Sequence, residues 1–366
     1  MDRTWGSSRT ERGRRLAAAT VVAAALTCGC TGTTGPAAPG PPDGTTAVPR
    51  DRLTFADVDA AMQQRLDDVG VPGAADLAVR EGRVLHRRTY GSYAFDTVVP
   101  IASASKWLTS ATIMTLVDEG KLALDDPVSR FLPSWSARRT TIRQLLSHQA
   151  GLAGSAGCLG RAALRSCADE IGAAPEVYAP GTEFHYGNAG YTVAAAVAEV
   201  AGGVAFEELF EARIARPLGL AHTTFGEDLT PAASGRSTLD DFGAFVAMMA
   251  ADGVTASGAR VLTAESVREI ERDQLHGLDT RNDFAVQITT FGTYGLGVWR
   301  DRSAPDGSTR MVSGSGSVGF YPWIDRERHA YGVLLVNDGA GGSGRAVRTS
   351  SRIVHDLVLP ALDNAD

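Results

Sequence analysis

Hydrophobic and polar positions divide the chain into a low-complexity beginning and a long folded part. In the folded part, apolar residues recur at intervals of three and four, which predicts helices. These helices span residues 53–69, 100–120, 141–147, 191–200, 205–213, 238–252, 263–273 and 344–359. Residues 151–183 are rich in Gly and Ala without long periodicity, and we interpret them as an insertion over the first subregion of the folded part.

Alternating apolar and polar positions predict strands near both ends of the folded part. Segments 75–79 and 84–90 flank a Glu81-Gly82 turn, and segments 294–299, 319–325 and 331–337 come late in the chain. Strands at both ends with helices between them predict an α+β fold. We expect one antiparallel sheet built from both termini and flanked by helices, together with an all-α subregion.

Segment 100–120 carries the first candidate chemistry. Ser103 and Lys106 are three residues apart, so they share one face at the start of a largely apolar helix. Free N–H groups and the helix dipole at that end would stabilise an oxyanion. A desolvated lysine could lose its proton near neutral pH and activate the hydroxyl. The alternative is a capped helix with a lysine that extends to solvent.

Lysine usage favours the chemical interpretation. The chain contains two lysines, Lys106 and Lys121, and uses arginine at its other cationic positions. Arginine cannot act as a base at accessible pH, whereas a buried lysine can.

Two further segments carry polar groups that could take part in the same reaction as Ser103 and Lys106. Tyr186 and Asn188 follow an Ala-Pro-Gly turn, and we expect a nearby lysine cation to lower the pKa of the tyrosine. The asparagine can hold both a lysine and a substrate amide. Residues 313–320 are rich in glycine, which would let a substrate carbonyl approach backbone N–H groups near Ser313, Ser315 and Gly316. A packed loop tyrosine and a plain flexible turn are the alternatives.

The first fifty residues resemble an export signal and a linker. A basic segment and a short apolar run (residues 16–27) precede Cys28-Gly29-Cys30 and a Thr/Gly/Pro/Ala-rich stretch. We therefore expect a lipoprotein-type signal peptide (1–30), a disordered linker (31–50) and a folded domain (51–366). Cys30 is the expected lipidation site, with Cys28 or ordinary secretory cleavage as alternatives. The expected location is the outer face of the bacterial cytoplasmic membrane, or the medium without lipidation.

The cysteines and the net charge limit the possible disulfides, cofactors and partners. Cys158 and Cys167 could form a disulfide in an oxidising compartment, or remain as two half-buried thiols. No Cys/His grouping has metal-ligand spacing, so we expect neither a metal nor another cofactor. A net charge of −7 argues against nucleic acid as a partner. We expect a monomer that acts on a small molecule.

Five segments, in order, resemble motifs of serine beta-lactamase and penicillin-binding-protein-like hydrolases, particularly the class C beta-lactamase, DD-peptidase and esterase branch. They are IASASK (101–106), EGKLALDDPV (119–128), LLSHQAGL (145–152), YGNAGY (186–191) and PLGL (217–220). The resemblance covers nearly all of the part after residue 50. It implies that Ser103 is the acylated nucleophile, that Lys106 and Tyr186 share the base and acid roles, and that Asn188 orients them.

The third motif departs from the family pattern. A lysine or histidine is usual there, followed by Thr or Ser and then Gly, whereas this chain has Ser313-Gly314-Ser315. The missing cation favours small esters or amides over beta-lactams and D-alanyl-D-alanine peptides, unless Arg310 supplies the charge.

Other functions remain as alternatives. A beta-lactamase or carboxypeptidase is one, and an inactive lipoprotein that binds cell-wall peptide is another. An α/β-hydrolase is excluded because no Gly-x-Ser-x-Gly pentapeptide occurs.

Overall fold

The computed structural model describes residues 49–135, 138–226, 228–278, 280, 283, 292–338 and 344–365. The expected signal peptide and nearly all of the expected linker lie outside these residues. Residues from Val48 to Asp366 form one compact unit. Among the described helices, none is long and apolar enough to cross a membrane.

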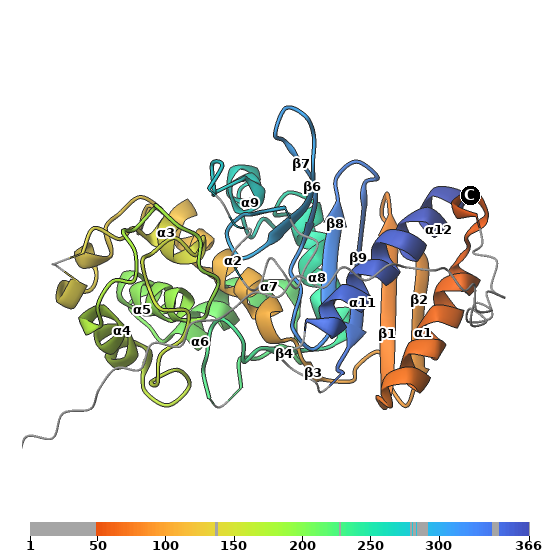
Figure 1. Ribbon diagram of the computed structural model, residues 1–366, viewed down its shortest axis with the longest axis horizontal. Helices are drawn as coiled ribbons and strands as arrows, with labels where there is room; N and C mark the ends of the chain where they lie inside the picture. The colour runs from red at the N-terminus through yellow and green to blue at the C-terminus, as the bar shows by residue number, and fades with distance from the viewer. Residues whose placement is uncertain are drawn as a thin grey trace, which may run out of the picture. The chain divides into compact units, whose positions relative to one another are not determined.

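A seven-stranded antiparallel sheet forms the centre of this unit, in the order β2-β1-β9-β8-β7-β6-β5 (Figure 1). β1 and β9 pair directly, so the two ends of the folded chain build one sheet, as the sequence predicted. A two-stranded sheet, β3 with β4, lies apart from it. The strands are β1 Gly73–Arg80, β2 Arg83–Gly91, β3 Val99–Pro100, β4 Arg236–Ser237, β5 Thr293–Tyr294, β6 Trp299–Ser303, β7 Thr309–Ser313, β8 Tyr321–Asp325 and β9 Ala330–Val336.

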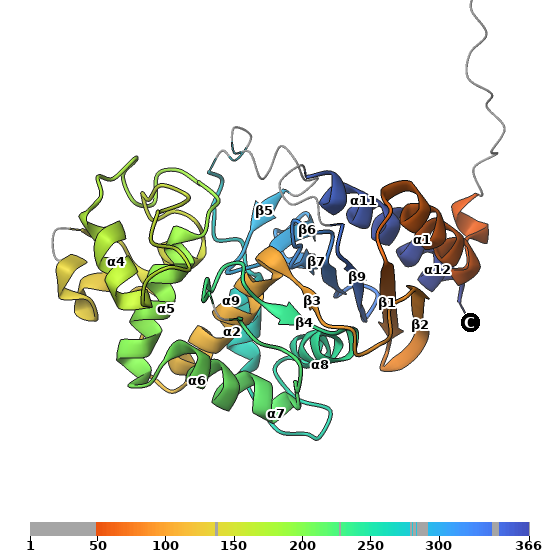
Figure 2. The ribbon, with the colours of Figure 1, turned by 90° about the horizontal axis from the view of Figure 1, so that it is seen from below.

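Helices cover both faces of the large sheet. Figure 2 shows α1, α11 and α12 on one face and α2, α8 and α9 on the other, with α4 to α6 forming a helical region beside α2, to which α3 also belongs (Figure 1). The helices are α1 Phe55–Val69, α2 Ser105–Asp118, α3 Ile142–Leu146, α4 Leu164–Ala173, α5 Ala189–Gly202, α6 Phe206–Phe210, α7 Arg216–Leu218, α8 Leu239–Ala250, α9 Ala264–Glu271, α11 Arg345–Ile353 and α12 Leu359–Asn364. The predicted α+β fold is confirmed.

Three local predictions need correction. Segment 294–299 is not one strand, because a turn containing Gly297 at φ +85° separates β5 from β6. β7 was not predicted, because its residues mix exposed and buried positions without alternation. Segment 151–183, which has no long periodicity and for which no helix was predicted, contains the ten-residue helix α4.

Candidate active site

Ser103 and Lys106 lie together where the chain enters α2. Ser103 is on a 3₁₀ turn (Ala102–Ala104) directly before the helix and is partly exposed, whereas Lys106 is completely buried. The lysine Nζ donates to Ser103 Oγ over 3.3 Å. The neighbouring Ser105 is fully buried and donates to the Ala102 carbonyl, so Ser103 is the hydroxyl that a substrate could reach.

Lys106 is held in an apolar site with few but well-placed acceptors. Its Nζ donates to Asn188 Oδ1 over 3.0 Å and to the Ala232 carbonyl over 3.2 Å. The ammonium also lies 4.6 Å from the centre of the Tyr186 ring. Burial lowers the pKa of Lys106 to about 7, so a substantial neutral fraction exists near neutral pH.

The Lys106 ammonium lies over the Tyr186 ring, and Ser103 is near enough to the Tyr186 hydroxyl to act on its pKa, so the predicted pair and the tyrosine share one site. The predicted lowering of its pKa is wrong. Burial raises the pKa of Tyr186 above its ordinary value, because desolvation opposes the phenolate more strongly than the nearby Ser103 hydroxyl favours it. The ring stacks on Trp299, with centroids 5.3 Å apart. Tyr186 therefore remains protonated and can pass on or donate a proton.

His148 supports the tyrosine loop. It is buried, and its ring centre lies 4.4 Å from that of Tyr186. Its Nδ1 accepts from the Gly187 N–H over 3.3 Å, and its Nε2 lies 3.3 Å from the Tyr294 hydroxyl. Burial and the nearby Lys106 hold the pKa of His148 well below its ordinary value. We therefore infer a neutral ring with the proton on Nε2, which supports the loop that carries Tyr186.

The glycine-rich third segment lies against the chain that leads into Ser103. The Gly314 N–H donates to the carbonyl of Pro322 in β8 over 3.0 Å, and the Gly316 N–H donates to the carbonyl of Phe320, just before β8, over 2.7 Å. Because successive N–H groups of an extended chain point in opposite directions, the Ser315 N–H is directed away from β8. A Cβ on Gly316 would lie 2.2 Å from the Ile101 carbonyl oxygen, so only glycine permits this close approach.

Ser313 faces a buried carboxylate that the sequence analysis did not identify. The serine is fully buried, and its Oγ donates to Asp301 Oδ1 over 2.9 Å. Asp301 Oδ2 accepts from the Tyr321 hydroxyl over 2.8 Å and lies 3.4 Å from His355 Nε2. No local motif marks Asp301, because the contact joins different strands and a helical segment.

Arg310 does not supply the missing cation in this structure. It is exposed and pairs with Glu327 over 2.9 Å. It also alternates with Met311 and Ser313 along β7, which places it on the opposite face of the sheet from Ser313.

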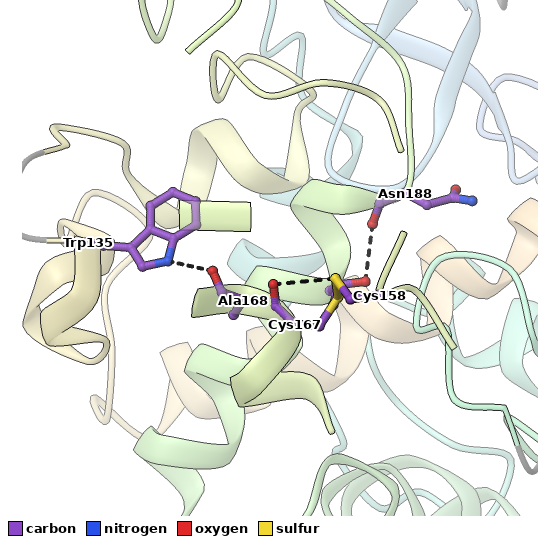
Figure 3. The surroundings of a disulfide bond; sticks show 6 residues. Trp135, Cys158, Cys167, Ala168 and Asn188 are labelled. Carbon is purple, nitrogen blue, oxygen red and sulfur yellow. Dashed lines mark hydrogen bonds between the residues drawn. A yellow bond between two sulfur atoms is a disulfide. The ribbon is translucent and has the colours of Figure 1, made fainter. Parts of the chain in front are cut away.

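The helical region beside α2 carries the disulfide. Cys158 and Cys167 are joined there, next to the Trp135 indole that donates to the Ala168 carbonyl (Figure 3). Within the described residues, no cluster of three or more His, Cys, Asp or Glu side chains could hold a metal ion.

A sequence model of the beta-lactamase family matches residues 58–355, which are most of the chain. The chain belongs to the beta-lactamase family. Penicillin-binding protein 4 of Amycolatopsis lactamdurans is 32% identical over 327 residues, which cover 71% of this chain and 83% of that protein. Esterase EstB of Burkholderia gladioli is 30% identical over 201 residues, which cover 46% of this chain and 51% of the esterase.

Structural similarity supports the same family. The structure of a candidate beta-lactamase from Bacteroides dorei DSM 17855 has a TM-score of 0.79 and 30% identity, and the match covers 85% of this chain and 99% of that one. The fold is therefore the beta-lactamase/transpeptidase-like fold that the motifs implied. Relatives in this beta-lactamase family include an esterase and penicillin-binding proteins, and the protein is a serine hydrolase.

Proposed function

We propose that this beta-lactamase-family protein hydrolyses small uncharged esters or amides through an acyl-enzyme on Ser103. The observation that carries the proposal is the position of a fully buried lysine, with a pKa of about 7, at 3.3 Å from a partly exposed serine hydroxyl. A lysine of this kind is a competent base near neutral pH.

In the proposed acylation, neutral Lys106 removes the Ser103 proton, directly or through the Tyr186 hydroxyl. The Ser103 Oγ then forms a bond to the substrate carbonyl carbon. The backbone N–H groups of Ser103 and Ser315 would stabilise the negative charge on the carbonyl oxygen. When the bond to the leaving group breaks, its oxygen or nitrogen takes the proton from Tyr186 or Lys106. A water molecule, deprotonated by the same groups, then forms a bond to the acyl carbon. The bond between that carbon and Ser103 Oγ breaks, Oγ takes the proton back from the same groups, and the acid leaves.

Asn188 would orient both the base and the substrate. Its Oδ1 accepts the hydrogen bond from Lys106. Because one oxygen of the amide is used in this way, the NH₂ group is directed elsewhere and can donate to the acyl side of a substrate.

The surroundings of Ser313 support a preference for uncharged substrates. The Ser313 hydroxyl proton is used in the bond to Asp301, so the serine does not offer a donor to a substrate carboxylate. Asp301 also adds negative charge near the position where relatives carry a cation. The alternative functions, a beta-lactamase or a D-alanyl-D-alanine carboxypeptidase, both require recognition of a substrate carboxylate.

The experiment that tests this proposal combines labelling with turnover. A fluorophosphonate probe should label Ser103, as located by mass spectrometry, and p-nitrophenyl acetate should be hydrolysed much faster than nitrocefin. Ser103→Ala should abolish both labelling and turnover. Efficient nitrocefin hydrolysis would favour the beta-lactamase alternative, whereas absent labelling and turnover would favour the inactive peptide-binding alternative.

We also propose that the protein is exported and anchored by a lipid on Cys30. The support is the order of the basic segment, the apolar run and the cysteine, together with a disulfide that fits an oxidising compartment. The full chain should fractionate with membranes, and Cys30→Ala should release it or stop its processing. Normal processing and membrane retention of Cys30→Ala would contradict lipidation at this residue.

A further inference from the structure

A buried arginine on α1 connects three distant parts of the chain. The Arg65 side chain is 3% exposed and donates from Nη1 to Ser350 Oγ over 2.8 Å. Its Nη2 donates to Asp338 Oδ2 over 2.8 Å and to the Ala346 carbonyl over 3.2 Å. The guanidinium thus joins α1 to α11 and to the residue two positions beyond β9.

The partners of Arg65 hold the turn that ends the third motif. Ser350 accepts from Arg65 and donates its own proton to the Gly319 carbonyl over 2.6 Å. The Asp338 N–H donates to the Val318 carbonyl over 2.9 Å. Gly319 has φ +97°, and a Cβ there would lie 2.7 Å from Arg65 Nη2. The guanidinium therefore packs directly against the turn.

The same turn lies against the residues that precede the candidate nucleophile. The Gly319 N–H donates to the Gly316 carbonyl over 2.9 Å, and Gly316 meets the Ile101 carbonyl as described above. Ala102, between Ile101 and Ser103, has a left-handed φ of 47°, an uncommon conformation that needs support from its surroundings. A shift of the turn would change the position of the Ser315 N–H relative to Ser103.

Stability alone is a weak explanation for this cluster. Taking a guanidinium and a carboxylate out of water costs several kcal/mol per ion, so buried ion pairs often contribute little net stability. Hydrogen bonds to a charged group are short and directional, which suits them to fixing a backbone position.

We propose that Arg65, acting through Ser350 and Asp338, is a positioning residue for the oxyanion-stabilising turn of the active site. This inference rests on the proposed hydrolase function. A misplacement of about 1 Å in a catalytic group can cost on the order of a hundredfold in rate. The loss should appear in kcat, because the oxyanion forms in the transition state and not in the bound substrate.

The test compares Ser350→Ala, Arg65→Lys and Arg65→Met with the wild-type full-length protein. Thr349→Ala is a matched hydroxyl control on α11, because Thr349 is only partly buried and its hydroxyl donates to the Arg345 carbonyl of its own helix. Arg87→Met is the charge control, because Arg87 forms an exposed pair with Asp240. Turnover of p-nitrophenyl acetate is normalised to the number of sites labelled by a fluorophosphonate, and thermal unfolding is measured alongside.

We expect Ser350→Ala to lower kcat about tenfold with KM changed less than threefold, since Gly319 loses its hydrogen bond. Arg65→Met should lose more, and Arg65→Lys should recover part of that loss by keeping the pair with Asp338. Unchanged kcat per labelled site in Ser350→Ala, with a lower unfolding temperature, would overturn the inference and leave a purely structural role. A wild-type protein that neither hydrolyses nor is labelled would overturn the proposed function, and this inference with it.

Discussion

Lys106 on α2 and Asp76 on β1 are both completely buried ionisable side chains, and burial moves both pKa values to about 7. Their surroundings differ. Lys106 donates to the partly exposed Ser103, whereas the Asp76 carboxylate lies 3.7 Å from His86 Nε2 in the layer beneath α1. A shifted pKa therefore does not by itself identify an active site. The accessible nucleophile beside Lys106 makes the difference.

In the region around Asp76, the neighbouring His86 makes its contacts with other protein side chains. Burial lowers the pKa of His86, and its ring stacks on Phe55 of α1, with centroids 4.6 Å apart. Its Nε2 also lies 3.4 Å from Asp59 Oδ1, which accepts from the Tyr90 hydroxyl. These groups contact one another within the protein, so we expect them to affect stability and not catalysis.

The largest expected difference between the two regions concerns activity. Lys106→Arg keeps the charge but removes the base, so hydrolysis of p-nitrophenyl acetate should fall by about a thousandfold or more. Lys121→Arg is the matched control, because Lys121 is an exposed partner of Glu119. Asp76→Asn should leave kcat within about twofold. Activity that survives Lys106→Arg at neutral pH would remove the proposed role of Lys106 as the base.

For stability the order of the two regions should be reversed, with the larger effect at Asp76. Folded Asp76 keeps its proton up to about pH 7, whereas the unfolded chain releases it near the ordinary pKa of 3.8. The free energy of unfolding should therefore fall as pH rises between these values. Asp76→Asn cannot ionise and should be more stable than wild type at pH 7 and above, by up to about 4 kcal/mol. Below about pH 4 this advantage should disappear. Urea unfolding at pH 4, 5.5 and 7.5 measures it, and an advantage independent of pH would contradict the explanation.

The pH profile of activity is the next effect in size. The base form of Lys106 increases as pH rises through about 7, so kcat/KM should rise about tenfold between pH 6 and pH 8. The raised pKa of Tyr186 predicts no loss of its proton in that range. Asp76→Asn should show the same profile as wild type. A shifted midpoint in that variant would mean that the two buried regions are electrostatically coupled.

The parts of this site that depend on local order could be predicted from the sequence. The spacing of Ser103 and Lys106 is fixed by helical geometry. The strands near both ends of the folded part follow from the alternation of apolar and polar residues. The pKa of Tyr186 could not be predicted, because burial depends on segments that fold over it. Asp301 and Arg65 were missed for a similar reason, since each acts through contacts across strands or helices that carry no motif.

The smallest expected effect concerns a third buried ionisable group, the Asp301 carboxylate, whose strand β6 lies closer in the sheet to the catalytic residues than the strand of Asp76 does. Its hydrogen-bond partner Ser313 pairs in register with Trp299, and Trp299 stacks on Tyr186. Negative charge at this position should disfavour substrates that carry a carboxylate, although the intervening distance and solvent screen the effect.

Asp301→Asn should therefore raise the ratio of nitrocefin to p-nitrophenyl acetate turnover by about threefold, with Asp240→Asn as an exposed control. Ser313→Lys restores the cation and should raise the same ratio. The increase should be smaller than a free cation would give, because the new ammonium would pair with Asp301. The double variant, Ser313→Lys with Asp301→Asn, frees that ammonium and should exceed both single variants. Equal ratios in all of these variants would show that Asp301 and Ser313 do not influence substrate charge preference.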